Sequence, residues 1–291
     1  MRIEVVADVK PLLGEGPLWD PEAERLYFID SLGKRVFRCT ADGGEMRAWT
    51  VPSEIGSMAL RQAGGAIVAL RDGFHALDLE TGELTHIIDP EPERASNRMN
   101  DGKVDRQGRF VCGSMDTGEE APTGSLWRFD EDHQLTELDS GIICSNGPCW
   151  SPDGKTLYFA DSFTGTISAY EYDPETGAVS NRRAFVNVDR SRGGAPDGAT
   201  VDAEGYVWSA NVFDGRIFRY GPDGSIDRVI EMPVVKITSL AFGGPGLDRL
   251  FVTSMAEPPL PKYPGDGQQR GALFRIDGLG VTGLPESKFS G

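Results

Sequence analysis

Two stretches of the sequence decide the fold: WSPDGKTLYFADS at residues 150–162 and VDAEGYVWSANV at residues 201–212. Each joins a tight turn containing Asp, Pro or Gly to a strand rich in aromatic and β-branched residues. Similar copies begin at four further positions: Trp19, Leu60, Val104 and Gly243. The chain therefore contains six repeats of roughly 40 to 50 residues, a period typical of propeller blades.

A second strand with period-two alternation follows many of the copies, as in RVFRCT from Arg35 and RIFRYGPDG from Arg216. No stretch between the copies has helical periodicity long enough to predict a helix. We therefore predict an all-β protein: one six-bladed β-propeller domain over residues 1–291, with four-stranded antiparallel blades around a central channel. The segment IEVVADV, at residues 3–9, is expected to complete the last blade and close the ring.

The chain is acidic, with a formal net charge of -16. Such a surface repels phosphate backbones and anionic lipid, so we expect neither nucleic acid nor a membrane as a partner. The four cysteines form no paired CxxC pattern, and the amino terminus lacks the apolar core of a secretory signal. We therefore expect a cytoplasmic protein, and the sequence makes no prediction of its oligomeric state.

The innermost strand of each blade precedes the turn, so counting back five positions from the turn selects one axial position per repeat. The six positions are Glu15, Gly56, Asn100, Asn146, Asp197 and Thr238. Because these positions face one axis, two carboxylates and two carboxamides are predicted to converge there. Buried carboxylates need a compensating charge, and these oxygens suit calcium, magnesium or manganese better than zinc or ferrous iron. The alternative is a polar channel that holds only water, since Asn or Asp before Gly is also a common turn pair.

Four segments carry a family resemblance: LGEGPLWD at 13–20, RMNDGKVDRQGR at 98–109, SNGPCWSPDGKTLYFADS at 145–162 and APDGATVDAEGYVW at 195–208. They resemble the senescence marker protein 30/gluconolactonase family, also called regucalcin-like. The resemblance covers nearly the whole chain, from about Leu13 to Arg275. It implies a six-bladed propeller with a single metal ion. By motif match, it implies that Glu15, Asn146 and Asp197 hold that ion.

The resemblance also implies a set of substrate contacts. Arg98 and Asn100 match the family's R-x-N-D-G motif, and Asp101 lies beside them. A family Glu that follows the G-T-M segment also contacts the substrate. Here the segment reads GSMDTGEEAPTGSLW, so either Glu119 or Glu120 matches. Substrate choice is expected to depend on three rim loops: residues 116–124, 187–196 and the proline-rich insertion 255–269.

Members of this family hydrolyse sugar lactones, so the resemblance implies a metal-dependent lactonase that converts an aldonolactone to its aldonic acid. The metal ion, with calcium favoured over zinc, manganese, magnesium and ferrous iron, would polarise the lactone carbonyl and lower the pKa of a bound water. We assign Asp197 the additional role of accepting the proton of that water. Two alternatives stay open: a phosphotriesterase-type hydrolase on the same scaffold, and a non-enzymatic calcium-binding regulator.

Overall fold

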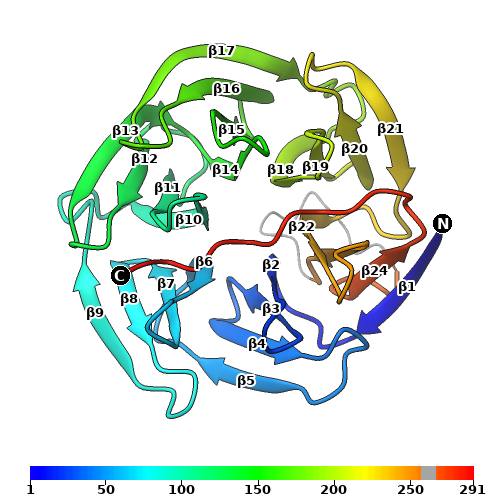
Figure 1. The fold of residues 1–291 in the computed structure, drawn as a ribbon, viewed down its shortest axis with the longest axis horizontal. Coiled ribbons are helices and arrows are strands. Elements are labelled where there is room, and N and C mark those ends of the chain that lie inside the picture. Colours follow the sequence, from blue (N-terminus) through cyan, green and yellow to red (C-terminus); the bar gives the residue numbers. More distant parts are fainter. Residues whose placement is uncertain (257–266) are drawn as a thin grey trace.

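The computed structural model describes residues 1–256 and 267–291, and Figure 1 shows the ring that they form. In these residues the chain folds into six four-stranded antiparallel sheets around a central axis and forms no helix. Each sheet is one blade, and the predicted six-bladed β-propeller is confirmed. No helix in these two ranges is long and apolar enough to cross a membrane. The proline-rich loop predicted at residues 255–269 falls largely outside the described residues.

The first three blades follow one another along the chain. Blade 1 contains β2 (Gly14–Asp20), β3 (Arg25–Asp30), β4 (Arg35–Cys39) and β5 (Arg47–Thr50). Blade 2 contains β6 (Ile55–Leu60), β7 (Ala66–Leu70), β8 (Gly73–Leu77) and β9 (Leu84–Ile88). Blade 3 contains β10 (Asn97–Val104), β11 (Phe110–Asp116), β12 (Gly124–Phe129) and β13 (Leu135–Ile142).

The last three blades include the one that joins the two ends of the chain. Blade 4 contains β14 (Ser145–Trp150), β15 (Thr156–Asp161), β16 (Thr166–Tyr172) and β17 (Val179–Asn187). Blade 5 contains β18 (Ala195–Val201), β19 (Val207–Val212), β20 (Arg216–Tyr220) and β21 (Ile226–Glu231). Blade 6 contains β22 (Ile237–Gly243), β23 (Arg249–Ser254), β24 (Leu273–Asp277) and β1 (Arg2–Ala7).

The strand β1 closes the ring, as predicted from the sequence. It pairs antiparallel with β24, with Arg2 opposite Asp277 and Val5 opposite Phe274. The guanidinium of Arg275 in β24 donates a hydrogen bond to the Glu4 carboxylate at 2.9 Å. Closure in this way leaves no blade incomplete and removes the open edge that β24 would otherwise present.

The hydrophobic core lies between neighbouring blades, where large apolar side chains interleave. Trp208 of blade 5 packs edge-on against Phe242 of blade 6, with ring centroids 5.7 Å apart. Trp19 of blade 1 stacks on Phe251 of blade 6 at 6.2 Å. Such aromatic pairs contribute about 0.5–1.5 kcal/mol each beyond their burial. Packing between blades therefore fixes the positions of the inner strands that surround the axis.

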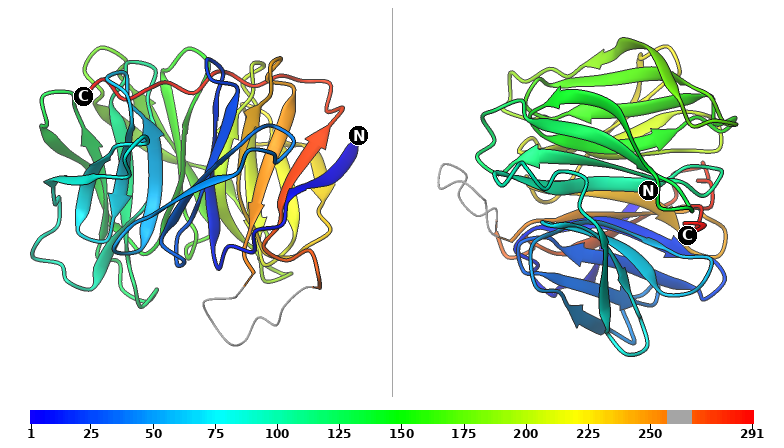
Figure 2. Two further views of the ribbon diagram at one scale, coloured as in Figure 1. Left: turned by 90° about the horizontal axis from the view of Figure 1, so that it is seen from below. Right: turned by 90° about the vertical axis from the view of Figure 1, so that its left-hand side faces the viewer.

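Residues 278–291 form a tail that was not predicted from the sequence. The tail leaves β24 and crosses one face of the ring, where it is red in Figures 1 and 2. Gly283 forms an antiparallel bridge with Asp202, and Phe289, fully buried, forms a parallel bridge with Arg61. Both partners lie in the turns that join the first and second strands of a blade. We call this side of the ring the turn face.

Lys103 and the tail bridge the channel near the turn face. The ammonium of Lys103 in β10 donates to the carbonyl of Ala199 in β18 at 2.9 Å and to the Glu286 carboxylate of the tail at 3.2 Å. These contacts reach from blade 3 to blade 5, past the inner strand of blade 4. The tail and Lys103 together occupy this end of the axis.

Candidate metal and substrate site

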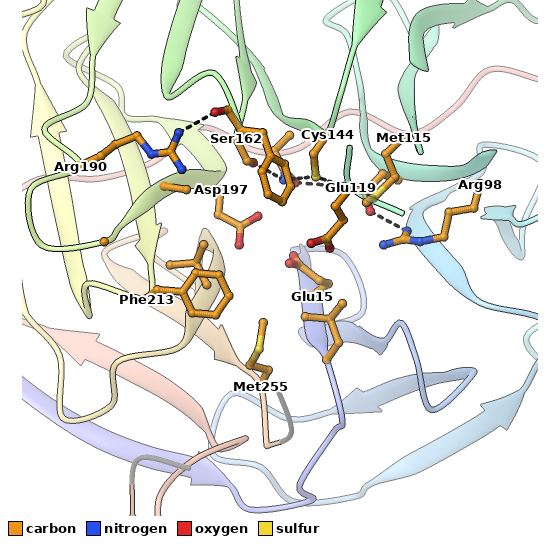
Figure 3. Close-up of a pocket in the computed structure, with 17 residues that line it drawn as sticks. Glu15, Arg98, Met115, Glu119, Cys144, Ser162, Arg190, Asp197, Phe213 and Met255 are labelled. Carbon is orange, nitrogen blue, oxygen red and sulfur yellow. Dashed lines mark hydrogen bonds between the residues drawn. The ribbon is translucent and has the colours of Figure 1, made fainter. Parts of the chain in front are cut away.

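A cavity opens on the axis away from the turn face, and Figure 3 shows the side chains around it. We call this cavity the pocket. Its wall includes Phe163, Phe213 and Met255, which follow the second strands of three blades. Its lining includes six residues predicted from the sequence: Glu15, Arg98, Asn100, Glu119, Asn146 and Asp197. The structure therefore brings residues of five separate segments together at one place.

A bulge lies at the axial position of each inner strand, and four of the six axial residues line the pocket. The pairing register shifts immediately after Glu15 in β2 and after Asn146 in β14, and it shifts across Asn100 in β10 and Asp197 in β18. A bulge redirects side chains and is common beside active sites. The shift recurs at the equivalent places in β6 and β22. The axial positions counted along the sequence are thus equivalent in structure.

Close packing explains the glycines that accompany the axial residues. Gly147, directly after Asn146, has a φ of +59°, a left-handed conformation that glycine adopts without steric cost. At Gly198, an added Cβ would lie 2.1 Å from Ser239 Oγ and 2.7 Å from Ser239 Cα. A larger residue there would push β18 away from β22. These glycines therefore hold Asn146 and Asp197 in position.

Hydrogen bonds orient the two axial carboxamides. Asn146 donates from Nδ2 to the Ser162 hydroxyl at 2.8 Å, and its Oδ1 lies 3.4 Å from Asn100 Nδ2. Asn100 donates from Nδ2 to the Ser145 carbonyl at 2.8 Å, and its Oδ1 accepts from Arg98 Nη1 at 2.7 Å. The Ser145 carbonyl only accepts and the Arg98 guanidinium only donates, so these partners identify which amide atom of Asn100 is oxygen, and Asn100 Nδ2 in turn faces the oxygen of Asn146. Asn146 contacts Ser162 through Nδ2, so its amide oxygen is not used in that contact. This oxygen is the atom that would bind a metal ion.

Arg98 is only 9% exposed, and burial lowers the pKa of its guanidinium, opposed by Cys144 and Glu119. Its Nη1 donates to the Met99 carbonyl at 3.0 Å and to Asn100 Oδ1. Within the described part of the chain, Arg98 forms these two hydrogen bonds. A guanidinium offers five N–H donors. The remaining donors of Arg98 are therefore available to a ligand in the pocket.

Glu15 and Asp197 direct their carboxylates into the same space (Figure 3). Burial raises the pKa of Glu15 well above its ordinary value, and the Asp197 and Asp101 carboxylates raise it further. Burial also raises the pKa of Asp197 well above its ordinary value, again with a contribution from Asp101. In both residues burial is the larger cause of the raised pKa, and neighbouring carboxylates of like charge add to it. A cation between them would remove that penalty.

The donor set fits a hard divalent cation. Two carboxylates and one amide oxygen, from Glu15, Asp197 and Asn146, are ligands that calcium, magnesium and manganese prefer. Over residues 1–256 and 267–291, no group of three or more His, Cys, Asp or Glu side chains could hold a metal ion. The predicted set depends instead on a carboxamide as its third ligand. That set stays a prediction, supported by its geometry and charge.

The structure distinguishes the two glutamates that the family motif left open. Glu119 lines the pocket from a left-handed backbone position with a φ of +58°. Glu120 is exposed and does not line it. The Asp116 carboxylate accepts the N–H groups of Glu120 at 3.2 Å and Ala121 at 3.0 Å, which holds this turn together. Of the two, only Glu119 is placed to contact a ligand in the pocket.

Asp101 is buried beside the pocket but does not line it. Its carboxylate accepts the N–H groups of Gly102 and Gly147, each at 2.8 Å. It therefore joins β10 to β14, and it acts on Glu15 and Asp197 through its charge. Substrate contact, the role considered for Asp101 from its sequence position, is not supported by this placement.

Sequence reasoning did not identify several residues of the pocket wall. Phe213 lies in the turn after β19 with a φ of +64°, which is uncommon for a large side chain. Arg190 lies within the rim segment 187–196, which was predicted to affect substrate choice, but nothing in its local sequence marks it as a pocket residue. Both positions depend on loop conformation, which the repeat pattern does not encode.

Comparisons with known proteins agree with this architecture. A family model described as "SMP-30/Gluconolactonase/LRE-like region" matches residues 13–256. Regucalcin from Xenopus laevis is 35% identical over 100% of this chain and 99% of its own length. A solved luciferin-regenerating enzyme has a TM-score of 0.93 at 30% identity, with 99% of each chain covered. Regucalcin from Agrobacterium tumefaciens, described as a calcium-binding protein, has a TM-score of 0.91 at 29% identity, covering 98% of this chain and 96% of its own.

Proposed function

Because this chain belongs to the SMP-30/gluconolactonase/LRE-like family, we propose that it hydrolyses a sugar lactone to the open-chain acid in the axial pocket. The observation that carries the proposal is the meeting of Glu15, Asn146 and Asp197 beside Arg98 and Asn100. The first three can hold a divalent cation, and the other two can hydrogen-bond a polyol. The family description names gluconolactonase, which supports a lactone as the substrate.

Glu15, Asn146 and Asp197 would hold one divalent metal ion, and calcium is our first choice. Their oxygens are hard ligands, and the Agrobacterium relative is described as a calcium-binding protein. Bound there, the ion would supply a Lewis acid for the lactone carbonyl and would favour ionisation of a nearby water. Magnesium, manganese, zinc and ferrous iron are the competing choices.

The side chains of the pocket have separable roles in this reaction. Asp197 would accept a proton from the attacking water as the water oxygen bonds to the carbonyl carbon. The ring C–O bond then breaks, and the proton passes to the ring oxygen that leaves. Arg98 and Asn100, which are hydrogen-bonded to each other at 2.7 Å, would hold the substrate hydroxyls and fix the ring. No covalent intermediate with the chain is needed.

The direct test is acid release from a panel of five- and six-membered aldonolactones, followed with a pH indicator. We expect hydrolysis well above the spontaneous rate, loss of the enzymatic rate with EDTA, and recovery with added calcium. Enzyme-free samples with and without calcium are the control for metal-catalysed hydrolysis. Rates that match spontaneous hydrolysis for every lactone would contradict the proposal.

The regulator hypothesis has one specific observation in its favour, the description of the Agrobacterium relative as a calcium-binding protein. Calcium binding measured by calorimetry, without hydrolysis of any lactone, would support it over the enzyme. Faster hydrolysis of a chromogenic phosphotriester than of any lactone would instead favour the phosphotriesterase alternative. A cytoplasmic location, and the absence of nucleic-acid and membrane partners, stay predictions.

Glu119→Gln and Glu120→Gln form a matched pair of variants that tests the shape of the pocket. We expect Glu119→Gln to lower kcat/KM for the best lactone by about tenfold or more, because a charged hydrogen-bond acceptor faces the substrate. Glu120→Gln should stay within about twofold of the wild type, since Glu120 is exposed outside the pocket. Equal kcat/KM losses in the two variants would contradict the placement of Glu119.

A further inference from the structure

The pocket wall carries a second arginine that the proposed reaction does not use. Arg190 lines the pocket from the segment between β17 and β18, whereas Arg98 lines it from β10. Figure 3 shows the two guanidinium groups on opposite sides of the cavity, with the carboxylates of Glu15, Glu119 and Asp197 between them. A ligand that spans the cavity from Arg98 would therefore reach the Arg190 side.

Blade 4 contacts the Arg190 side chain, which is exposed to solvent and also lines the pocket. Its Nη1 donates to the carbonyl of Phe163, another pocket residue, at 2.5 Å. Its stem passes over Gly165, where an added Cβ would lie 2.7 Å from Arg190 Cδ. Gly165 also has a φ of +72°, a conformation that favours glycine. The hydrogen bond to the Phe163 carbonyl and the space beside Gly165 thus allow the guanidinium to lie at the pocket.

Arg192, two positions along the same segment, is engaged in a different way. Its Nε lies 2.8 Å from an Asp214 carboxylate oxygen, and its Nη1 lies 3.6 Å from Glu231. Arg192 does not line the pocket. Within the residues that the structure describes, Arg190 has no such carboxylate partner, and its hydrogen bond to Phe163 uses only Nη1. The remaining N–H donors of Arg190 are therefore available for an anion.

The charge of the pocket is compatible with an anionic ligand. Glu15, Glu119 and Asp197 contribute three carboxylates, and the two arginines contribute two positive charges. With the proposed divalent ion in place, the pocket has one net positive charge. An anionic group at the Arg190 side would lie across the cavity from Glu119 and Glu15 but on the same side as Asp197, whose negative charge the proposed divalent ion would offset (Figure 3).

We propose that Arg190 is a specificity-determining residue that binds a carboxylate on the substrate, at the end farthest from the lactone carbonyl. This inference rests on the proposed lactone hydrolysis and narrows its substrate class to monolactones of sugar dicarboxylic acids. A guanidinium and a carboxylate form a bidentate, charge-assisted pair, which a neutral hydroxymethyl group cannot form. Arg190 would thereby select the acidic lactone without taking part in bond making or breaking.

The test compares two lactones that differ at one carbon: the γ-lactone of gluconic acid and the γ-monolactone of glucaric acid. The first ends in a hydroxymethyl group and the second in a carboxylate. The wild type is expected to have the higher kcat/KM for the glucaric lactone. Arg190→Met should lower that value by about 10- to 100-fold, mainly through KM, while changing the gluconic lactone by no more than about twofold. Arg190→Lys should recover part of the loss because it restores the charge.

Arg192→Met is the matched control, since it removes a guanidinium from the same segment outside the pocket. It is expected to leave both kcat/KM values within about twofold of the wild type. Hydrolysis of neither lactone by the wild type would overturn the role of Arg190, and it would contradict the proposed function itself only if the panel of aldonolactones also stayed at the spontaneous rate. A wild-type preference for the gluconic lactone, or equal losses on both lactones in Arg190→Met, would overturn the role of Arg190 while leaving lactone hydrolysis intact.

Discussion

Replacement of Asp197 by asparagine is expected to lower kcat for lactone hydrolysis by about 10²- to 10⁴-fold, the range that a general base contributes. A carboxamide keeps the size of the side chain and an oxygen ligand, but it does not accept a proton near neutral pH. The measurement is kcat at saturating lactone and saturating calcium, so that weaker metal binding does not account for the loss. The metal-free variant should also be no less stable than the wild type, because one of two repelling buried carboxylates is gone.

Asp189→Asn provides the control for this experiment. Asp189 is exposed, does not line the pocket, and accepts the N–H of Ser191 at 2.9 Å within its own turn. Its kcat should remain within about twofold of the wild type. If Asp197→Asn kept more than about a tenth of the wild-type kcat, then Asp197 would not be the general base.

Deletion of residues 1–7 is expected to lower the free energy of unfolding by about 3–6 kcal/mol, a large share of the total for a protein. The deletion removes the whole outer strand of blade 6 and exposes the edge of β24. It also removes Ala7 and Ile3 from the apolar clusters that they pack against. The measurement is urea unfolding followed by circular dichroism, with the m-value as a check on two-state behaviour.

A substitution within β1 separates loss of the strand from loss of a side chain. Val5→Thr changes a residue that is 39% exposed and keeps the backbone pairing with β24. Its free energy of unfolding should remain within about 0.5 kcal/mol of the wild type. A truncated chain that unfolds at the same urea concentration as the full chain would mean that β1 does not hold the ring closed.

The blade number and ring closure could be predicted because the turns after Trp19, Trp150 and Val201 recur at a regular spacing. The turns are local structures, encoded by a few Asp, Pro and Gly residues in series. Counting from them also identified the axial positions, since the bulge recurs at the same place in every inner strand. Equivalent sequence positions therefore became neighbours in space without any knowledge of the loops.

The remainder of the site depends on non-local contacts that no repeat encodes. Glu119 and Glu120 are adjacent in sequence, and only the turn that Asp116 organises places one of them in the pocket. Asp101 follows Asn100 directly, yet its carboxylate is bound by backbone N–H groups, one of them from Gly147 in the next blade. Arg190 reaches the pocket only because Gly165 of blade 4 leaves room for its stem. Such packing is set by tertiary structure, so sequence patterns alone did not predict it.

The tail and Lys103 lie across the end of the axis opposite the mouth of the pocket. The tail crosses the turn face, and Lys103 reaches Ala199 and Glu286 near that end of the axis. In the proposed hydrolysis, the lactone would enter through this mouth and the acid that forms from it would leave through the same opening. Because the product would have to leave before the next lactone binds, we expect the rim segments 116–124 and 187–196 to affect product release as well as substrate choice.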